Sequence, residues 1–375
     1  FDGHNIPRLQ RALRAAIARG GPVLLHVYTQ KGRGHALAEE NPERYHGVGP
    51  LQVVNKRKTL SYSETFGKSL VALAETNPKI VAITAAMPDG TGLHHFARRF
   101  PDRFFDVGIA EQHALTLAGG MAKEGLRPVV AIYSTFLQRG YDQIIHDLAL
   151  QKLPVVIGVD RAGVVGDDGP THHGVFDISF LRAVPNLTIL APRTGHELQA
   201  MLEWALAQSG PVAIRYPRGD ASRHGSQASF DPQRPIGAEL VKSGRDLVIF
   251  AVGPMAEVAL EAARLAEPEV SCGVVSVRSI KPLDANTLLN QARRTQSVLT
   301  VEDHVLAGGF GSSILELLQG EGIRIERLGY PDTFIPQGDR HHLQEEYGLS
   351  VQHVLQTIRK AASLRPLQAV ARKDL

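Results

Sequence analysis

Glu111 is the residue whose position most suggests catalysis. It stands at the predicted start of a helix in the segment GIAEQHA, with Gly108 before it and Gln112 and His113 after it. Free N–H groups and the helix dipole favour an anion in a first helical turn, so a carboxylate there can simply complement the helix. The polar neighbours, and a second titratable cluster further along the chain, favour a chemical role instead.

That second cluster lies in the loop RAGVVGDDGPTHHGVFD at residues 161–177, directly after a predicted strand. It holds Asp168, His172 and His173, and histidines exchange protons near neutral pH. A loop of this length inside a compact domain is usually functional. The alternative is that both histidines are simply exposed loop residues. Because they are adjacent in the sequence, we expect one side chain to point inward and the other to point outward.

Four cations stand where they could meet an anion. Arg161 and Arg218 each follow a predicted strand, and ligands of open α/β sheets bind at the C-terminal ends of strands. The planar guanidinium fork matches phosphate oxygens and stays charged. Lys31 and Arg33 alternate with glycines in a loop near the N-terminus, which is compatible with an anion site but is weak evidence by itself.

Other motifs receive structural interpretations. Ser61 and Glu64 have the spacing of a capping box at a helix start. His94 and His95 are expected on a solvated helix face, and no cysteine or carboxylate spacing around them indicates a metal site. The glycines at 307–313 run into a helix start without the G-x-G-x-x-G spacing, so a tight strand–helix connection is preferred over a phosphate site.

Apolar runs of strand length alternate with helical periodicities, which predicts an α/β fold with two doubly wound, mainly parallel sheets. Near the N-terminus we expect a helix at 6–20 and a buried strand at 21–29. The expected organisation is a remnant of a first domain at 1–58, an α/β domain at 59–218, a polar linker at 219–235 and a second α/β domain at 236–375.

The composition is that of an ordinary globular protein. The hydrophobic fraction is 43%, and the formal net charge is +3 with both signs interspersed. The pI near 8.9 is mildly basic, but no basic patch with interleaved aromatic residues favours nucleic acid. The lone Cys272 excludes an internal disulfide and suits a reducing cytoplasm, and no apolar run has the roughly 18 residues of a membrane span.

Four segments, at 108–114, 131–147, 159–174 and 215–219, closely resemble the 1-deoxy-D-xylulose-5-phosphate synthases, which are thiamine-diphosphate enzymes of the transketolase superfamily. The resemblance covers nearly the whole chain. It implies a cytoplasmic homodimer that decarboxylates pyruvate and transfers the two-carbon unit to glyceraldehyde 3-phosphate, for isoprenoid precursors and thiamine. FDGHN at the N-terminus resembles an internal motif of the family, so we expect a fragment.

The resemblance also implies residue roles. Glu111 would bond the aminopyrimidine of thiamine diphosphate and promote the tautomer that ionises the thiazolium C2. Other cofactor contacts would come from the side chains of Lys31 and Phe136 and from the backbone near Met87; where relatives often have Arg-Glu-Gly, this sequence has Pro-Asp-Gly, so no side-chain role is carried over there. The implied substrate-side residues are Tyr133, Arg139, Asp168, His172 and His46, with Arg161 and Arg218 on the phosphate.

The second α/β domain would have an architectural and dimer-forming role. The family's Mg²⁺ is held by a G-D-G…N motif, and that motif is absent from these 375 residues. We therefore expect no metal ligand for the cofactor in this chain. Two alternatives stay open: another thiamine-diphosphate enzyme, such as a pyruvate dehydrogenase β-type protein or a half-length transketolase, and a non-catalytic fragment.

Overall fold

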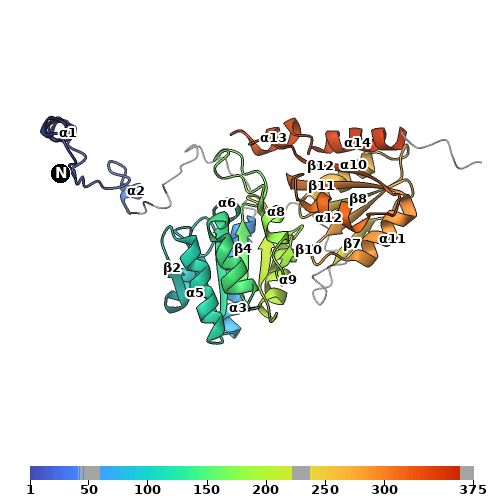
Figure 1. The fold of residues 1–375 in the computed structure, drawn as a ribbon, viewed down its shortest axis with the longest axis horizontal. Helices are drawn as coiled ribbons and strands as arrows, with labels where there is room; N and C mark the ends of the chain where they lie inside the picture. Colours follow the sequence, from blue (N-terminus) through green and yellow to red (C-terminus); the bar gives the residue numbers. More distant parts are fainter. Residues whose placement is uncertain (41, 43–44, 46–59, 222–236, 364–375) are drawn as a thin grey trace, which may run out of the picture. The chain divides into compact units, whose positions relative to one another are not determined.

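The structure, a computed structural model, describes residues 1–40, 42, 45, 60–221 and 237–363. The chain divides into two compact units, Phe1–Lys58 and Thr59–Leu375. The second unit holds both of the sheets found among the described residues (Figure 1).

The first unit contains two helices, α1 (Ile6–Arg19) and α2 (Ala36–Glu40). The side chain of Asn5 accepts a hydrogen bond from the backbone of Arg8 at the start of α1, and Gly20 with φ of 66° ends the helix. The predicted helix at 6–20 is thus confirmed, but the predicted buried strand at 21–29 is wrong. Leu24 there is 93% exposed, because an apolar run becomes a buried strand only where a sheet and a core receive it.

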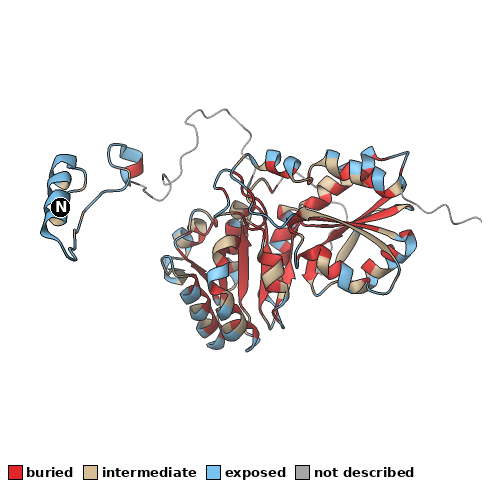
Figure 2. Ribbon diagram, turned by 45° about the horizontal axis from the view of Figure 1, so that its top comes forward, coloured by how far each residue is buried: buried red, intermediate tan, exposed pale blue. Residues whose placement is uncertain are grey.

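The larger sheet has seven strands in the order β10-β5-β6-β4-β3-β1-β2. All neighbours are parallel except β10 and β5. Its strands are β1 Ile80–Thr84, β2 Phe104–Asp106, β3 Arg127–Tyr133, β4 Val156–Asp160, β5 Thr188–Leu190, β6 Val212–Arg215 and β10 Ser279–Lys281. The continuous apolar runs noted in the sequence form its central strands, which are buried on both faces (Figure 2).

Helices cover both faces of this sheet. One face packs against α3, α4 and α9, and the other against α5, α8 and the segment from 134 to 149. The helices are α3 Tyr62–Thr76, α4 His94–Arg99, α5 Glu111–Lys123, α6 Ser134–Leu137, α7 Tyr141–Gln143, α8 Asp177–Arg182 and α9 Gly195–Leu206. After β3 the chain forms a series of short helical turns that ends in a π-helical stretch, Ile144–Ala149.

The smaller sheet has the strand order β12-β11-β8-β9-β7, with β7 antiparallel to β9. Its strands are β7 Ala238–Lys242, β8 Leu247–Val252, β9 Cys272–Val277, β11 Ser297–Val305 and β12 Arg324–Tyr330. The accompanying helices are α10 Met255–Leu265, α11 Ala285–Thr295, α12 Phe310–Leu317, α13 Arg340–Glu346 and α14 Val351–Ser363. The prediction of an α/β fold with two mainly parallel sheets is confirmed.

The two sheets are joined by β10, which follows β9 of the smaller sheet but pairs with β5 at the edge of the larger one. The Nζ of Lys281 donates to the carbonyl of Arg182 at 2.8 Å and also to that of Val184. Ile280, 2% exposed, belongs to a core cluster with side chains from both sheets. No pattern in the sequence indicates this three-residue strand.

The glycine-rich start of α12 is closed by a carboxylate of the chain itself. The backbone N–H groups of Phe310 and Gly311 donate to the side chain of Glu302 at 2.6 and 2.7 Å. This confirms the expected tight strand–helix connection, since the helix N-terminus already has its anion. Among the described residues, no helix combines the length and the apolar character needed to cross a membrane.

Candidate active site

The predicted site residues gather at the C-terminal ends of β3 and β4. Tyr133 is the last residue of β3 and is paired in register with Asp160, the last residue of β4. Phe136 and Arg139 follow β3 in the short turns, and Arg161 follows β4. This edge of an open α/β sheet is where such folds bind ligands.

Glu111 is the first residue of α5 and is only 2% exposed. Gly108, with φ of 70°, makes the turn from β2 into this helix. The Nη1 of Arg139 donates to the two carboxylate oxygens of Glu111 at 3.1 and 3.3 Å, while 52% of the Arg139 side chain remains exposed. A buried carboxylate is thus oriented by a partly exposed guanidinium that a ligand can reach.

Phe136 lies at the centre of an aromatic surface beside this pair. Its ring stacks with Tyr133 at a centroid distance of 5.7 Å and lies at 73° to the His172 ring at a centroid distance of 5.2 Å. The guanidinium of Arg139 lies 5.6 Å from the centre of the Phe136 ring. These contacts connect the segment after β3 to the loop that carries His172.

Arg161 has a left-handed backbone, with φ of 59°, which is uncommon outside glycine and directs attention to function. Its Nη1 donates to the carbonyl of Gly90 at 2.8 Å, and its guanidinium stacks 3.8 Å from the Tyr133 ring centre. Burial raises the pKa of Tyr133 to about 12, so the phenol keeps its proton at neutral pH. A Cβ added to Gly90 would lie 1.7 Å from the Tyr133 hydroxyl oxygen, which explains the glycine.

Asp160 is a site residue that the sequence reasoning missed. It is fully buried, and its carboxylate accepts hydrogen bonds from Ser63 at 2.7 Å and from Arg161 at 3.2 Å. Burial raises its pKa to about 6, although Arg161 and the Ser63 hydrogen bond oppose that shift. The available signal was a charged residue that ends an otherwise apolar strand.

In the loop after β4, Asp168 forms an ion pair with Arg218 at 2.8 Å. The two histidines divide as predicted into one deeply buried and one outer side chain. His173 is 2% exposed and hydrogen-bonds to Val165 N and Pro336 O. His172 is half-buried and lies against Phe136, so the outer histidine is the one that faces the aromatic surface.

Residues of the smaller sheet hold this loop from behind. Asp303 of β11 accepts hydrogen bonds from the backbone N–H of Val164 at 3.1 Å and from the Tyr330 hydroxyl at 2.8 Å. Behind the loop, Arg215 forms a buried ion pair with Asp177 at 2.8 Å. Arg215 is therefore structural, in contrast to Arg218, three residues further along.

Met87 is buried, and its carbonyl accepts hydrogen bonds from the N–H and the hydroxyl of Thr91 at 3.1 and 2.7 Å. The loop from 87 to 92 is thereby folded back beside Gly90. The expectation for the residues after it is wrong: His94 and His95 are partly buried against the carboxylate of Glu64. Ser61 does cap α3 by accepting from the backbone of Glu64, so that half of the capping box is confirmed.

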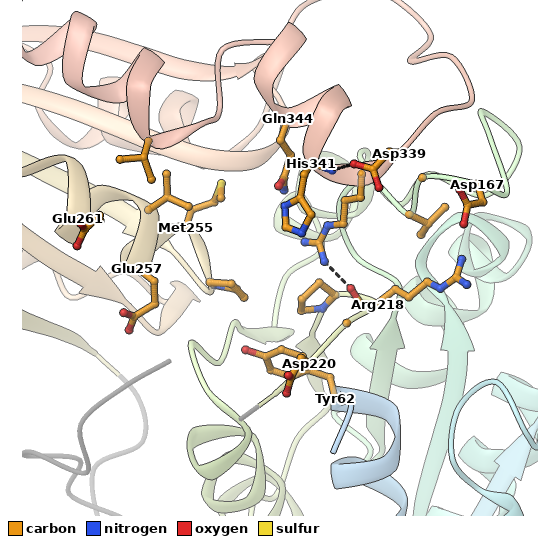
Figure 3. A pocket seen from close by; sticks show the side chains of 18 of the residues that line it. Tyr62, Asp167, Arg218, Asp220, Met255, Glu257, Glu261, Asp339, His341 and Gln344 are labelled. Atoms are coloured by element: carbon orange, nitrogen blue, oxygen red, sulfur yellow. Dashed lines mark hydrogen bonds between the residues drawn. The ribbon is translucent and has the colours of Figure 1, made fainter. Parts of the chain in front are cut away.

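A cavity of about 740 Å³ lies between the two sheets of the second unit (Figure 3). Tyr62 of α3 and Arg218 of the loop after β6 line it on one side, and Met255 and His341 line it from α10 and α13. The carbonyl of Arg218 accepts a hydrogen bond from Arg340 there. Among the described lining residues, Arg218 alone belongs to the predicted site, so the cavity borders the site from behind.

Two predicted residues lie outside the described part of the second unit. Lys31 is exposed in the first compact unit, in a turn where Gly32 packs closely on Ala38. His46 lies outside the described residues. In the second unit, the contacts above link the members Glu111, Tyr133, Phe136, Arg139, Arg161 and His172, and pair Asp168 with Arg218.

Family models match both halves of the second unit. The pyrimidine binding domain of transketolase matches residues 58–223, and the transketolase C-terminal domain matches residues 237–354.

Curated relatives named 1-deoxy-D-xylulose-5-phosphate synthase are about half identical in sequence. The protein from Desulforudis audaxviator is 51% identical over 97% of this chain and 60% of its own length. The protein from Halothermothrix orenii is 50% identical over 97% of this chain and 59% of its own length. The chain therefore spans less than two thirds of these relatives.

Among solved structures, a chain described as "Split gene transketolase, inactive beta4 tetramer" aligns with a TM-score of 0.72 and 33% identity. The alignment covers 82% of this chain and 99% of that one. Transketolase from Campylobacter jejuni aligns with a TM-score of 0.68 at 22% identity, over 87% of this chain and 50% of that chain, and supports the fold alone.

Proposed function

Because the chain belongs to the transketolase family, we propose that it is the pyrimidine-binding and C-terminal part of a 1-deoxy-D-xylulose-5-phosphate synthase. The enzyme would decarboxylate pyruvate and transfer the two-carbon unit to glyceraldehyde 3-phosphate, the first step towards isoprenoid precursors. The names of relatives at 50–51% identity support this choice of reaction. We assign residues 59–218 and 236–375 to the two α/β domains, 219–235 to the linker and 1–58 to part of a further domain.

The observation that carries the proposal is the buried Glu111 carboxylate beside the Phe136 ring and the Arg139 guanidinium. An aminopyrimidine has a hydrogen-bonding edge and an aromatic face, and these side chains offer a carboxylate to the first and a ring to the second. The fit is therefore good for the pyrimidine end of thiamine diphosphate. Bound thiamine diphosphate supplies the electron sink that decarboxylation of a 2-oxo acid requires.

The residues of this chain then have separable tasks. Glu111 holds the pyrimidine edge and exchanges a proton with it, and Arg139 fixes the orientation of the carboxylate. The backbone near Met87 completes the cofactor contact. His172, whose Nδ1 lies 2.9 Å from Thr171 Oγ1, would exchange a proton with a substrate that lies on Phe136. The Tyr133 phenol stays protonated and can donate a hydrogen bond.

Glyceraldehyde 3-phosphate would be held by Arg161 and Arg218. Asp168 accepts from Arg218 at 2.8 Å, so a substrate phosphate competes with that carboxylate for the guanidinium. Both side chains are about 40% exposed, and exposed ion pairs add little free energy of stabilisation. Replacement of the Asp168 carboxylate by a substrate phosphate therefore costs little free energy. Asp168 thereby keeps Arg218 aligned until phosphate arrives.

The diphosphate end of the cofactor has a poorer fit to this chain. The sequence holds no G-D-G motif with a downstream asparagine, and Lys31 offers a single mobile charge. The ligands of Mg²⁺ would come from a polypeptide region other than these 375 residues. The split-gene transketolase chain is described as an inactive tetramer, which supports the same expectation here. We propose a homodimer in the complete enzyme.

A half-length transketolase is the second candidate, favoured by the alignment over 99% of the split-gene chain. The 33% identity to that chain is lower than the 50–51% identity to the synthases. A fusion of this chain to the N-terminal part of the Desulforudis audaxviator synthase allows both reactions to be assayed. Formation of 1-deoxy-D-xylulose 5-phosphate from pyruvate and glyceraldehyde 3-phosphate supports the proposal. Two-carbon transfer between sugar phosphates without that product, or no product from a folded fusion, contradicts it.

A further inference from the structure

Two histidines and one carboxylate meet where the starts of α3 and α4 come together, on one face of the larger sheet. Glu64 lies in the first turn of α3, and His94 and His95 are the first two residues of α4. Glu64 Oε2 lies 2.7 Å from His95 Nε2, and Glu64 Oε1 lies 3.7 Å from His94 Nε2. One ligand atom from each residue lies within 4.8 Å of the others.

Two imidazoles and one carboxylate are a donor set typical of zinc, which binds four ligands and accepts water in an open fourth position. Tetrahedral coordination at about 2.0–2.2 Å sets donor atoms roughly 3.4 Å apart, so Glu64 Oε2 and His95 Nε2, now 2.7 Å apart, would separate slightly around the ion. The side chains are 36%, 19% and 26% exposed for Glu64, His94 and His95, so an ion from solvent can reach a group that is already partly desolvated.

Asp89 stands where an outer partner of the site would be needed. The buried Nδ1 of His94 has no hydrogen-bond partner among the described residues, and Asp89 Oδ1 lies 3.6 Å away from it. Histidines that bind metal through one nitrogen usually donate from the other to a carboxylate, which fixes the ring. A small rotation of His94 towards the carboxylate completes that arrangement.

Lys68 is the competing cation. Its Nζ lies 3.8 Å from Glu64 Oε2, one helical turn along α3, and half of its side chain is exposed. Because exposed pairs at this spacing contribute only a few tenths of a kcal/mol, a metal ion displaces it readily.

We propose that Glu64, His94 and His95 bind one divalent transition-metal ion of the zinc type, which fastens the start of α3 to the start of α4. The loop that carries Met87 and Gly90 leads from β1 into α4, and His94 N donates to Pro88 O in that loop at 3.0 Å. The ion thus stabilises one wall of the candidate active site without contact with a reacting group. The inference rests on these contacts and is independent of the proposed reaction.

Zinc binding to the 375-residue chain, purified without a histidine tag, tests the inference by isothermal titration with Zn²⁺ alone. We expect one ion per chain, with stoichiometric binding lost in His94→Ala and in His95→Ala. Asp89→Asn should weaken binding about 10- to 100-fold, as outer-shell changes do. His341→Ala is the matched control, because His341 also lies in the first turn of a helix beside a second histidine, and this variant should bind Zn²⁺ as the unmodified chain does.

Two further readouts separate a site from loss of fold. Tetrahedral Co²⁺ absorbs visible light, so Co²⁺ should give that spectrum with the unmodified chain and not with folded Glu64→Gln. Zn²⁺ at about 100 times its Kd should shift the folding equilibrium about 100-fold towards the folded state, and the shift should vanish in His94→Ala. Equal Zn²⁺ affinity of the unmodified chain and a folded His94→Ala/His95→Ala variant, or no Zn²⁺ binding by either, would overturn the inference.

Discussion

Replacement of Asp303 by alanine should destabilise the second unit and loosen the loop after β4. Asp303 is 7% exposed, and its carboxylate accepts from the N–H of Val164 and the hydroxyl of Tyr330, both of which are fully buried residues. Arg340 and Gln344 donate to its other oxygen at 3.2 and 3.3 Å.

The size of the effect follows from the groups left without an acceptor. A buried donor that loses its partner costs about 1–3 kcal/mol, so Val164 and Tyr330 together give about 2–6 kcal/mol. Arg340 adds less, because 24% of its side chain is exposed to solvent that can replace the carboxylate. Stabilities of native domains are about 5–15 kcal/mol, so the variant should unfold at a clearly lower urea concentration.

The single tryptophan, Trp204 in α9, provides a fluorescence signal for unfolding of the second unit. Asp332→Ala, at an exposed position, is the control and should change the free energy of unfolding by no more than about 0.5 kcal/mol. Hydrogen exchange of the Val164 amide should also accelerate in Asp303→Ala. If Asp303→Ala lowers the free energy of unfolding by less than about 1 kcal/mol and leaves hydrogen exchange of the Val164 amide unchanged, residues of the smaller sheet do not hold this loop.

Three further outcomes are expected. In the fusion enzyme, Arg161→Ala and Arg218→Ala should raise the KM for glyceraldehyde 3-phosphate about ten- to hundredfold and change the KM for pyruvate little. Steady-state kinetics that show equal increases in both KM values would indicate a structural or cofactor role instead. Burial raises the pKa of Asp160 to about 6, so the folded state holds a proton that the unfolded chain loses near pH 4. The contribution of protonated Asp160 to the free energy of unfolding is therefore complete below about pH 4 and is lost as the pH rises through about 6. Relative to Asp160→Asn, the wild type should therefore lose on the order of 2 kcal/mol of stability between about pH 4 and pH 7 in urea titrations, and parallel pH curves would contradict this. The 375-residue chain alone should bind thiamine diphosphate with Mg²⁺ only weakly. A Kd of about 1 μM or below, measured by isothermal titration, would show that the diphosphate end of the cofactor needs no ligands beyond those of this chain.

The buried strands of the second unit could be predicted because parallel strands covered on both faces are continuous apolar runs. CGVVSV at Cys272–Val277 is such a run and forms β9 over the same residues. The segment at 21–29 has the same appearance, but among the described residues of the first unit it forms only the isolated bridge from Tyr28 to Asp2, and the sequence does not encode that difference locally. β10 could not be predicted, because three residues have no periodicity and its partner strand lies about 90 residues away.

The candidate site was predictable where chemistry and strand ends coincide, as at Arg161 and Arg218. The approach of Glu64 to His94 and His95 could not be predicted, because it depends on the packing of Gly92 against the backbone of Ser63. A Cβ on Gly92 would lie 2.1 Å from Ser63 O, so the two helix starts come together only with glycine there. The inner position of His173 likewise depends on Pro336, 163 residues further along the chain.

The central claim is that Glu111 activates bound thiamine diphosphate, and exchange of the thiazolium C2 proton for deuterium measures that step directly. In the fusion enzyme, Glu111→Ala should slow exchange and turnover at least ~100-fold while the folded structure persists. Glu124→Ala, at the exposed C-terminal end of the same helix, is the control and should exchange at the normal rate. A folded Glu111→Ala enzyme that exchanges the C2 proton as fast as the Glu124→Ala enzyme would contradict the account.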